Sequence, residues 1–489
     1  MRRRLGRWLA VCGVLLAGDC NFAPKYKPPV VAIPVAYKEV GPWQPATPYD
    51  TLPRGPWWRM YGDRLLDRLE PKLLAANPTL AAAVANYDSA RAFAAQIRSG
   101  LFPAITAGGT ATGTGPDLSK RTFRAPDQYN WFGFNAADIM LDYEVDVWGR
   151  IHDEVAAGKA SAQATAADLA NVQLGLETEL AIAYFNLRGL DAEAKVLADT
   201  VVAYRKALQI VQNRFAGKVA SGLDVSRAAT QLDTALAAES EIIAERALYE
   251  HAIASLVGRP ASDFAIAPAV VTFPLPQIPT GVPSILLQRR PDIASAERQV
   301  AATNAQIGAA RAAFYPIVNL GVLGGVENTG WLPLAGAPFS FWAIGPKLVA
   351  PLFEGGLLRA RLAQAYAQRR LIASQYRAVV LAAFQQVEDN LSLLNNLGRQ
   401  AVQDQAAVRE ANRTLTIAMN LYVDGAVNYL EVAVAQEQLL NLQVSLVTLQ
   451  SRRQLASVQL VRALGGGWSN GELPSGRKLF LYADDPPHR

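Results

Sequence analysis

Two long segments without proline dominate this chain. Residues 127–259 contain no proline, and neither do residues 352–473. Proline interrupts helices because it lacks a backbone N–H and its ring clashes with the preceding turn. These segments therefore permit helices far longer than those of ordinary globular domains. Prolines gather instead in residues 24–56 and 260–291, which favours extended or irregular structure there.

Apolar residues within both segments recur at alternating steps of four and three. In the first segment the series is Leu176, Leu180, Ala183, Leu187, Leu190, Ala194, Leu197, Val201, Tyr204, Leu208, Val211 and Phe215, and in the second it includes Val380, Phe384, Val387, Leu391 and Leu394. This spacing is typical of a coiled-coil seam. A helix over residues 149–215 would be about 100 Å long at ~1.5 Å per residue, which excludes a compact globule. Each long helix is then expected to turn and return toward Gly258 or Gly465.

The chain also reads as two copies of one unit. An offset of 213 residues pairs Pro103 with Pro316, and an offset of 207 pairs Asp224 with Glu431. Each unit predicts a helix, two strands and two long helices: helices over 78–100 and 291–313, and strands over 103–112, 131–146, 316–326 and 339–350. The predicted organisation is a signal peptide (1–19), an extended segment (20–60), a first repeat (61–260), a proline-rich linker (261–283), a second repeat (284–468) and a C-terminal tail (469–489).

The first residues resemble the signal of an exported lipoprotein. Four arginines precede the apolar stretch from Trp8 to Ala17, and "LLAGDC" ends at Cys20. The apolar stretch is too short to span a bilayer as a helix. "LLAG" before a cysteine is similar to the bacterial lipobox, although Asp19 stands where that pattern has a small residue. We expect a covalent lipid on Cys20, and Asn21, in place of the aspartate that signals inner-membrane retention, points to the outer membrane.

Composition argues against several other functions. The net charge of +5 falls to +2 without residues 1–19, which hold four arginines and one aspartate, so the charge gives no reason to expect nucleic acid as a partner. The three histidines show no metal-ligand spacing, and no other cofactor is predicted. Asp142, Glu144 and Asp146 alternate as on one strand face. A general acid–base role is one interpretation, but a water-facing barrel or tunnel wall explains them better, so the chain is not expected to be an enzyme.

Residues 131–149 and 339–353 are rich in aromatic side chains and have about the length of a β-strand that crosses a bilayer. A small soluble sheet on a helical bundle is the alternative. Four strands cannot close a barrel, and an open edge in lipid would leave backbone N–H and C=O groups unpaired. Other copies must therefore complete the strands. Pro103 and Pro316 would mark the passage from an aqueous helical tube into the membrane.

Stretches spread from residue 20 to 468 resemble one known family. They are "CNFAPKYKPP", "WWRMYGDRLLDRL", "LLQRRPDIASAERQVAATNAQIGAARAAFYP", "DYEVDVWGRI", "NYLEVAVAQ" and "ALGGGW". The chain is similar to the outer-membrane factors of tripartite efflux systems (the TolC/OprM-like superfamily), specifically the NodT-like outer-membrane lipoprotein branch. The resemblance implies a mainly α protein with a transmembrane β part, in which a trimeric twelve-stranded barrel, four strands per protomer, continues into an α-helical tunnel.

The resemblance also implies the function and the partners. It implies a passive exit duct for small molecules in the outer membrane, which extends into the periplasm as a homotrimer. The partners would be a periplasmic adaptor and an inner-membrane transporter, usually a proton-driven one. Two alternatives stay open: a non-transporting coiled-coil scaffold lipoprotein of the envelope, and the outer-membrane duct of a protein secretion system.

Site residues carried over from the family lie near the two turns between the long helices. Asp224 and Glu431 are the acidic gate candidates, Leu430 is the apolar constriction candidate, and Tyr422 is placed to hydrogen-bond to the other repeat. Both acids could instead be solvated helix-start residues favoured by the macrodipole. The tip expected to contact the adaptor includes Gly217, Lys218, Leu223, Gly425 and Asn428. No metal site is expected.

Overall fold

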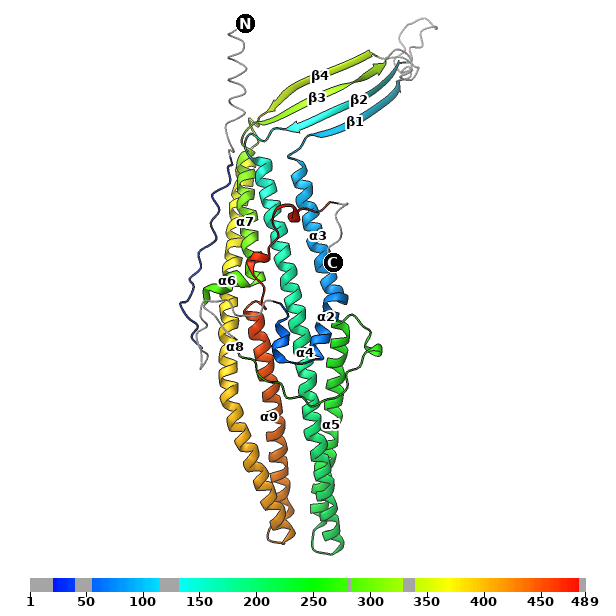
Figure 1. The fold of residues 1–489 in the computed structure, drawn as a ribbon, viewed down its shortest axis with the longest axis vertical. Coiled ribbons are helices and arrows are strands. Elements are labelled where there is room, and N and C mark those ends of the chain that lie inside the picture. Colours follow the sequence, from blue (N-terminus) through cyan, green and yellow to red (C-terminus); the bar gives the residue numbers. More distant parts are fainter. Residues whose placement is uncertain (1–20, 40–54, 115–131, 279–282, 329–338, 483–489) are drawn as a thin grey trace.

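The protein is a long helical body with a four-stranded sheet at one end (Figure 1). The computed structural model describes residues 21–39, 55–114, 132–278, 283–328 and 339–482. The expected signal peptide and Cys20 lie outside these residues, as do most of the two loops that join the strands in pairs.

The described chain repeats one order of elements. The first copy consists of α3 (Pro78–Ser99), β1 (Ala104–Thr114), β2 (Phe132–Glu144), α4 (Arg150–Ala216) and α5 (Gly222–Leu256), and the second consists of α7 (Pro291–Ala312), β3 (Ile317–Asn328), β4 (Phe339–Val349), α8 (Leu357–Val423) and α9 (Tyr429–Ala463). The corresponding helices have equal lengths of 22, 67 and 35 residues. The internal duplication read from the sequence is therefore present in the fold.

The predicted coiled-coil seam forms the buried face of the long helices. Leu180, Leu187 and Val211 of α4 are fully buried, as are Val380 and Leu391 of α8. At the end of the predicted series Phe215 is half exposed, because the hairpin ends there and offers nothing to cover it. α4 and α8 are each about 100 Å long at ~1.5 Å per residue, as expected.

Two glycines allow the returning helices to end against the neighbouring backbone. Gly258 follows α5 with φ +70°, and a Cβ there would lie 2.4 Å from the Ala76 carbonyl oxygen. Gly465 follows α9 with φ +94°, and a Cβ there would lie 2.3 Å from the Arg289 carbonyl oxygen. Neither position tolerates a side chain, so this device ends each repeat at the same place.

The largest hydrophobic core lies around the middle of the body. Here α2 (Leu66–Ala76), α6 (Leu286–Arg289) and the 3₁₀ helix Trp57–Tyr61 pack against the long helices (Figure 1). The Tyr61 ring packs 4.9 Å from that of Phe185, and its hydroxyl is 2.8 Å from Ser457 Oγ. The sequence predicted an extended segment throughout residues 20–60. That prediction is wrong for residues 57–60, which form the 3₁₀ helix with Tyr61, and burial of its three aromatic rings stabilises this turn.

Residues 21–39 do run as an extended strap along α7 and α8. Arg311 donates to the Phe22 carbonyl (2.9 Å) and Asn304 donates to the Pro24 carbonyl (2.6 Å). The Phe22 ring stacks on Tyr315, which stacks on Trp148, each at 4.8 Å between centroids. Since Tyr315 directly precedes Pro316 at the start of β3, the strap begins at the junction between helices and sheet.

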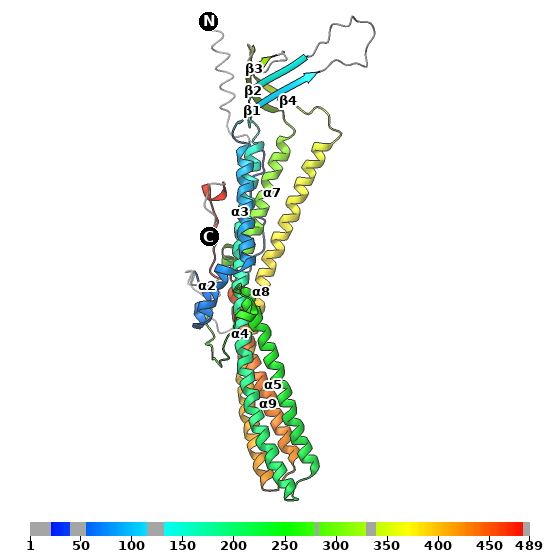
Figure 2. The ribbon, with the colours of Figure 1, turned by 90° about the vertical axis from the view of Figure 1, so that its right-hand side faces the viewer.

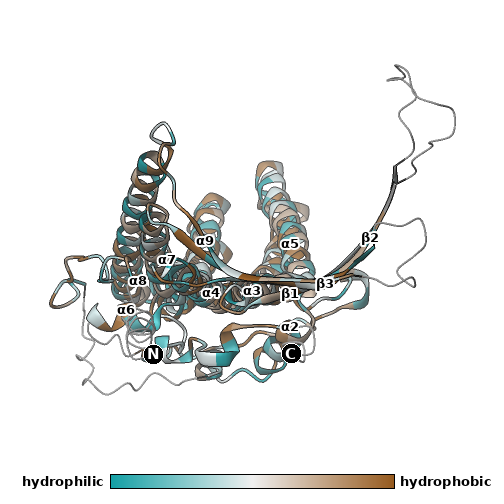
Figure 3. Cartoon of the chain, turned by 90° about the horizontal axis from the view of Figure 1, so that it is seen from above, coloured by the Kyte–Doolittle hydropathy of each residue, from teal (hydrophilic) through white to brown (hydrophobic). Residues whose placement is uncertain are grey.

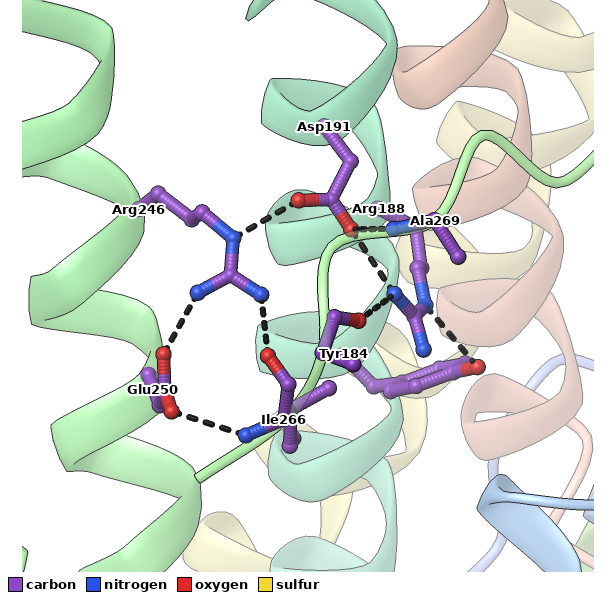
Figure 4. A network of polar contacts seen from close by, with 8 residues as sticks. Tyr184, Arg188, Asp191, Arg246, Glu250, Ile266 and Ala269 are labelled. Carbon is purple, nitrogen blue, oxygen red and sulfur yellow. Dashed lines mark hydrogen bonds and ion pairs between the residues drawn. The ribbon is translucent and has the colours of Figure 1, made fainter. Parts of the chain in front are cut away.

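A buried ionic network fastens the proline-rich linker to the first hairpin (Figure 4). Asp191 accepts from Arg188 and from Arg246, each at 2.7 Å. The same carboxylate accepts from the Ala269 N–H (3.0 Å), and Glu250 accepts from the Ile266 N–H (2.8 Å). The backbone N–H groups of the linker thus donate hydrogen bonds to the carboxylates of Asp191 on α4 and Glu250 on α5.

The sheet is antiparallel in the order β1-β2-β3-β4, and its central pair joins the two repeats. The register places exposed apolar residues on one face: Ile105, Ile139, Trp342, Ile344 and Leu348. The opposite face carries exposed Met140, Phe339 and Val349 together with most of the polar residues: Thr106, Thr110, Asp138, Asp142, Asn319 and Lys347. This alternation is that of strands with one face in lipid and the other in water.

The predicted run of three acids on one strand is only partly correct. Asp142 and Glu144 share the polar face of β2, but Asp146 lies beyond the strand end. Its carboxylate accepts from the backbone N–H of His152 (2.8 Å) and contacts the ring Nδ1 (2.7 Å). Glu144 pairs with Arg150 at 2.6 Å. Two of the three acids therefore anchor the start of α4.

Across the described residues, no helix combines the length and the apolar character needed to cross a membrane.

Candidate functional site at the far end of the long helices

Two short turns close the helical hairpins at the end opposite the sheet (Figure 2). Both follow the same backbone scheme: Val219 N–H donates to the Arg214 carbonyl (2.9 Å), and Ala426 N–H donates to the Leu421 carbonyl (2.8 Å). Such bonds end a helix through one left-handed residue. In the second turn that residue is Gly425 (φ +78°), whereas in the first it is Lys218 (φ +59°). Lysine adopts this conformation only at a cost in free energy.

Asp224 has a structural role at the start of α5. Ser221 and Asp224 form a capping box: the Asp224 N–H donates to Ser221 Oγ (3.2 Å), and the carboxylate accepts from the Ser221 N–H (3.1 Å) and hydroxyl (2.8 Å). Arg227 is the nearest cation, at 3.9 Å. At the equivalent start of α9, Asn428 makes no side-chain cap. Asp224 is therefore a helix-start residue, as one of the two interpretations of the sequence expected. Its role as a gate stays a prediction.

Tyr422 lies between the two hairpins, but it does not make the predicted hydrogen bond. Its hydroxyl has no hydrogen-bond partner in the described chain. Instead, the Arg214 guanidinium lies over its ring, 4.8 Å from the centroid, and donates to the Val423 carbonyl (2.8 Å). The pKa of Tyr422 is raised, mainly by burial. The nearby charge of Arg214 opposes this rise, and the charge of Asp224 adds to it. The repeats are therefore linked by a cation–π contact and a charged cap on the C-terminal end of α8.

A second set of hydrogen bonds between the two hairpins lies further from the tip. Gln231 of α5 donates to the Ala433 carbonyl (2.9 Å) and accepts from the Tyr429 hydroxyl (3.2 Å). The Tyr429 ring meets Tyr422 edge to face at 5.4 Å. Burial, followed by the neighbouring Tyr204, raises the pKa of Tyr429. Together with the apolar residues around Val211, these contacts hold the two hairpins together at the tip.

The remaining gate candidates point away from this cluster. Leu430 is 41% exposed, and Glu431 is exposed in the first turn of α9 with no hydrogen bond or ion pair among the described residues. The structure thus brings Asp224 and Tyr422 to one cluster and leaves Leu430 and Glu431 on a free surface. The five predicted adaptor-contact residues, Gly217, Lys218, Leu223, Gly425 and Asn428, are all exposed at the end of the hairpins.

Sequence reasoning missed Arg214, Gln231 and Tyr429. For Arg214 and Tyr429 the signal is asymmetry between the repeats: under the 207-residue offset, Arg214 pairs with Leu421 and Tyr429 pairs with Gly222. Gln231 pairs with Gln438, so it has no such signal. A residue that differs between two otherwise matched tips is not required by the fold that the repeats share. It is therefore a candidate for contacts between the two repeats.

No set of residues that could hold a metal ion is found in the described ranges, which omit residues 1–20 and the chain's last seven. The described tip carries carboxylates, amides, cationic side chains and aromatic rings, and its hydroxyl–carboxylate contact between Ser221 and Asp224 belongs to the capping box of α5. Its geometry suits docking and closure of a passage.

Comparisons with known proteins agree with this architecture. A model of the outer membrane efflux protein family matches residues 69–259 and 282–466. The chain is 29% identical over 469 residues to the solvent efflux pump outer membrane protein SrpC of Pseudomonas putida, covering 94% of this chain and 98% of SrpC. It is 27% identical to the outer membrane protein OprJ of Pseudomonas aeruginosa, covering 94% and 95%.

A solved structure has the same fold. The outer membrane protein VceC from Vibrio cholerae aligns with a TM-score of 0.77 at 29% identity, covering 84% of this chain and 98% of VceC. The two matched ranges fall on the two repeats, and each ends one residue after the glycine that closes its repeat, Gly258 or Gly465. This chain therefore belongs to the outer membrane efflux protein family.

Proposed function

We propose that this protein is the outer-membrane duct of a tripartite efflux pump, a passive exit for small molecules. Three copies form a twelve-stranded barrel in the outer membrane, and their long helices continue it as a tunnel through the periplasm. A periplasmic adaptor docks at the exposed tip, and an inner-membrane transporter, proton-driven, supplies the cargo. The relatives named as components of solvent efflux pumps support this assignment.

One observation carries the proposal: the sheet is divided into an apolar and a polar face and is open at both edges. β1 and β4 each pair on one side only within the chain. In lipid, unpaired edge groups cost several kcal/mol each, roughly, so strands from other copies must complete them. A non-transporting scaffold would need neither the polar inner face nor this completion.

The proposal is tested by conductance of the purified full-length protein in planar bilayers, together with heat-modified gel migration. We expect discrete conductance steps from a species that migrates as a trimer before heating and as a monomer afterwards. A protein that stays monomeric and never conducts would contradict the proposal.

The lipid anchor is a separate part of the proposal. The strap places residue 21 at the helix–sheet junction, where Phe22 stacks on Tyr315. A diacylated Cys20 would then enter the inner leaflet beside the barrel. Metabolic labelling with a radioactive fatty acid should mark the wild type but not Cys20→Ser, and equal labelling of both would exclude acylation at this residue.

A further inference from the structure

A groove of about 500 Å³ lies between the two helical hairpins, closer to the middle of the body than the tip cluster. α4 forms its floor, and α5 and α9 form its sides. Figure 3 shows α5 and α9 on one side of α4, with α2 on the other. α2 and α6 cover the opposite side of the long helices (Figure 3). Since elements packed on that side would fill a passage, we place the proposed tunnel on the side of α5 and α9, and the groove then opens toward it.

The walls of this groove are largely apolar. Its lining includes Leu197, Ala235, Ile242, Leu440 and Val444. The Tyr204 side chain also lines it and is 6% exposed. A volume of this size suits a drug-sized molecule, and apolar walls with a few placed polar groups are typical of small-molecule sites.

The charges around the groove have one sign. Glu193, Glu241 and Glu437 contribute to its lining, which includes no lysine or arginine among the described residues. Burial, and then the charges of Glu245 and Glu241, raise the pKa of Glu193. Burial and the charge of Glu437 raise the pKa of Tyr204 to about 12. Negative charge thus acts on Glu193 from α5 and on Tyr204 from α9, and a cation placed in the groove would be attracted by both sides.

We propose that this groove binds organic cations with an aromatic or aliphatic body as they pass along the tunnel. The apolar walls would receive the body, and the three carboxylates would attract the charge. An anion of the same size and shape would be repelled. This inference rests on the proposed function, since only a duct presents the groove to a passing solute.

A matched pair of probes separates charge from hydrophobicity. Tetraphenylphosphonium and tetraphenylborate have the same shape and opposite charge. Their binding is measured by equilibrium dialysis against the full-length protein in nanodiscs, with binding to empty nanodiscs subtracted. We expect saturable binding of the phosphonium ion and none of the borate ion.

Three variants locate the site. The triple variant Glu193→Gln, Glu241→Gln, Glu437→Gln should weaken phosphonium binding at least tenfold. Ala238→Trp, which fills the groove from α5 without changing charge, should also abolish it. The control is Glu239→Gln, a single charge removed from the same helix at a position outside the lining; residues two apart face different sides of a helix, so binding should be unchanged.

Four results would overturn the inference: no saturable cation binding, equal binding of both probes, retention of binding in Ala238→Trp, or an equal loss in Glu239→Gln. The first is expected if another copy of the chain fills the groove in the assembled protein. Conductance recorded on the same preparation keeps the two proposals apart. A conducting trimer without cation binding refutes the groove alone, whereas a protein without a pore refutes the duct.

Discussion

The guanidinium of Arg214 lies over the ring of Tyr422, 4.8 Å from its centroid, and bridges the two repeats. One of its nitrogens also donates to the Val423 carbonyl, where α8 ends. The Arg214 side chain of the first hairpin therefore contacts the second hairpin twice: it donates a hydrogen bond to a carbonyl at the end of α8 and lies over an aromatic ring. If the tunnel opens by separation of its hairpins at the tip, this contact must break.

Replacement of Arg214 should loosen the closed tip. Arg214→Leu introduces the residue that the second repeat has at this position, and it removes interactions worth roughly 1–3 kcal/mol. We expect a higher single-channel conductance. Tyr422→Phe keeps the ring and removes a hydroxyl that has no hydrogen-bond partner among the described residues, so it should behave as the wild type. A closed Arg214→Leu channel, or an open Tyr422→Phe channel, would contradict this role of the contact.

The left-handed Lys218 predicts a stabilising substitution. Lys218→Gly should stabilise the first turn by up to about 1 kcal/mol, because glycine adopts φ +59° without strain. Gly425→Ala should destabilise the second turn by a similar amount. Gly217 has a negative φ, and a methyl group added there would make only ordinary contacts, so Gly217→Ala serves as the neutral control. Hydrogen exchange of amides at the helix ends measures each change; slower exchange in Gly425→Ala would refute the account.

Buried Glu70 should make stability depend on pH. Burial, reinforced by the charge of Glu177, raises the pKa of Glu70 from 4.5 to about 10. Between these values the folded chain keeps a proton that the unfolded chain has released, so the free energy of unfolding falls as pH rises. Below about 4.5 both states hold the proton and no such loss occurs.

Glu70→Gln removes this titration. The thermal midpoint of the wild type should fall from pH 5 to pH 8 more steeply than that of Glu70→Gln, and Glu239→Gln should keep the wild-type slope. Identical slopes in wild type and Glu70→Gln would show that Glu70 titrates alike in the folded and unfolded chains.

The network around Asp191 should control how tightly the linker is held. Asp191→Asn leaves Arg188 and Arg246 without their shared carboxylate, and loss of one partner from a buried ionic network costs roughly 3–5 kcal/mol. Chymotrypsin should then cleave faster after Phe264, which lies in the linker two residues before Ile266. Asp199→Asn removes an exposed pair with Lys195 on the same helix and should leave the rate unchanged. Equal rates in both variants would mean that other contacts hold the linker.

Sequence periodicity predicted the long helices and paired strands because each depends on a repeating choice between apolar and polar residues. The buried seam of α4 and the strand that begins after Pro316 are examples. The Arg214–Tyr422 contact could not be predicted from sequence periodicity. It joins residues of different repeats, and no local pattern sets the distance between two hairpins. The departure of Asp146 from its strand has a local cause, since its carboxylate caps the backbone of His152.

The last prediction separates the two acidic gate candidates, which the sequence treated as equivalent. Asp224 is held in the capping box with Ser221 and its side chain is 15% exposed, whereas Glu431 is exposed and unpaired within the described chain. In the proposed trimer both would contribute to a negative mouth that favours cations. Only Glu431 can lose its charge without loss of a helix cap.

Glu431→Gln should therefore reduce cation preference, measured as the reversal potential in a salt gradient, with the thermal midpoint unchanged. Asp224→Asn should reduce the preference as well and also destabilise the tip, because the hydrogen bonds from Ser221 lose their charged acceptor. If Glu431→Gln keeps the full preference, its carboxylate does not face the passage. If neither variant alters it, both acids act only as helix-start residues, since a charge that lines a pore cannot be removed without a shift in reversal potential.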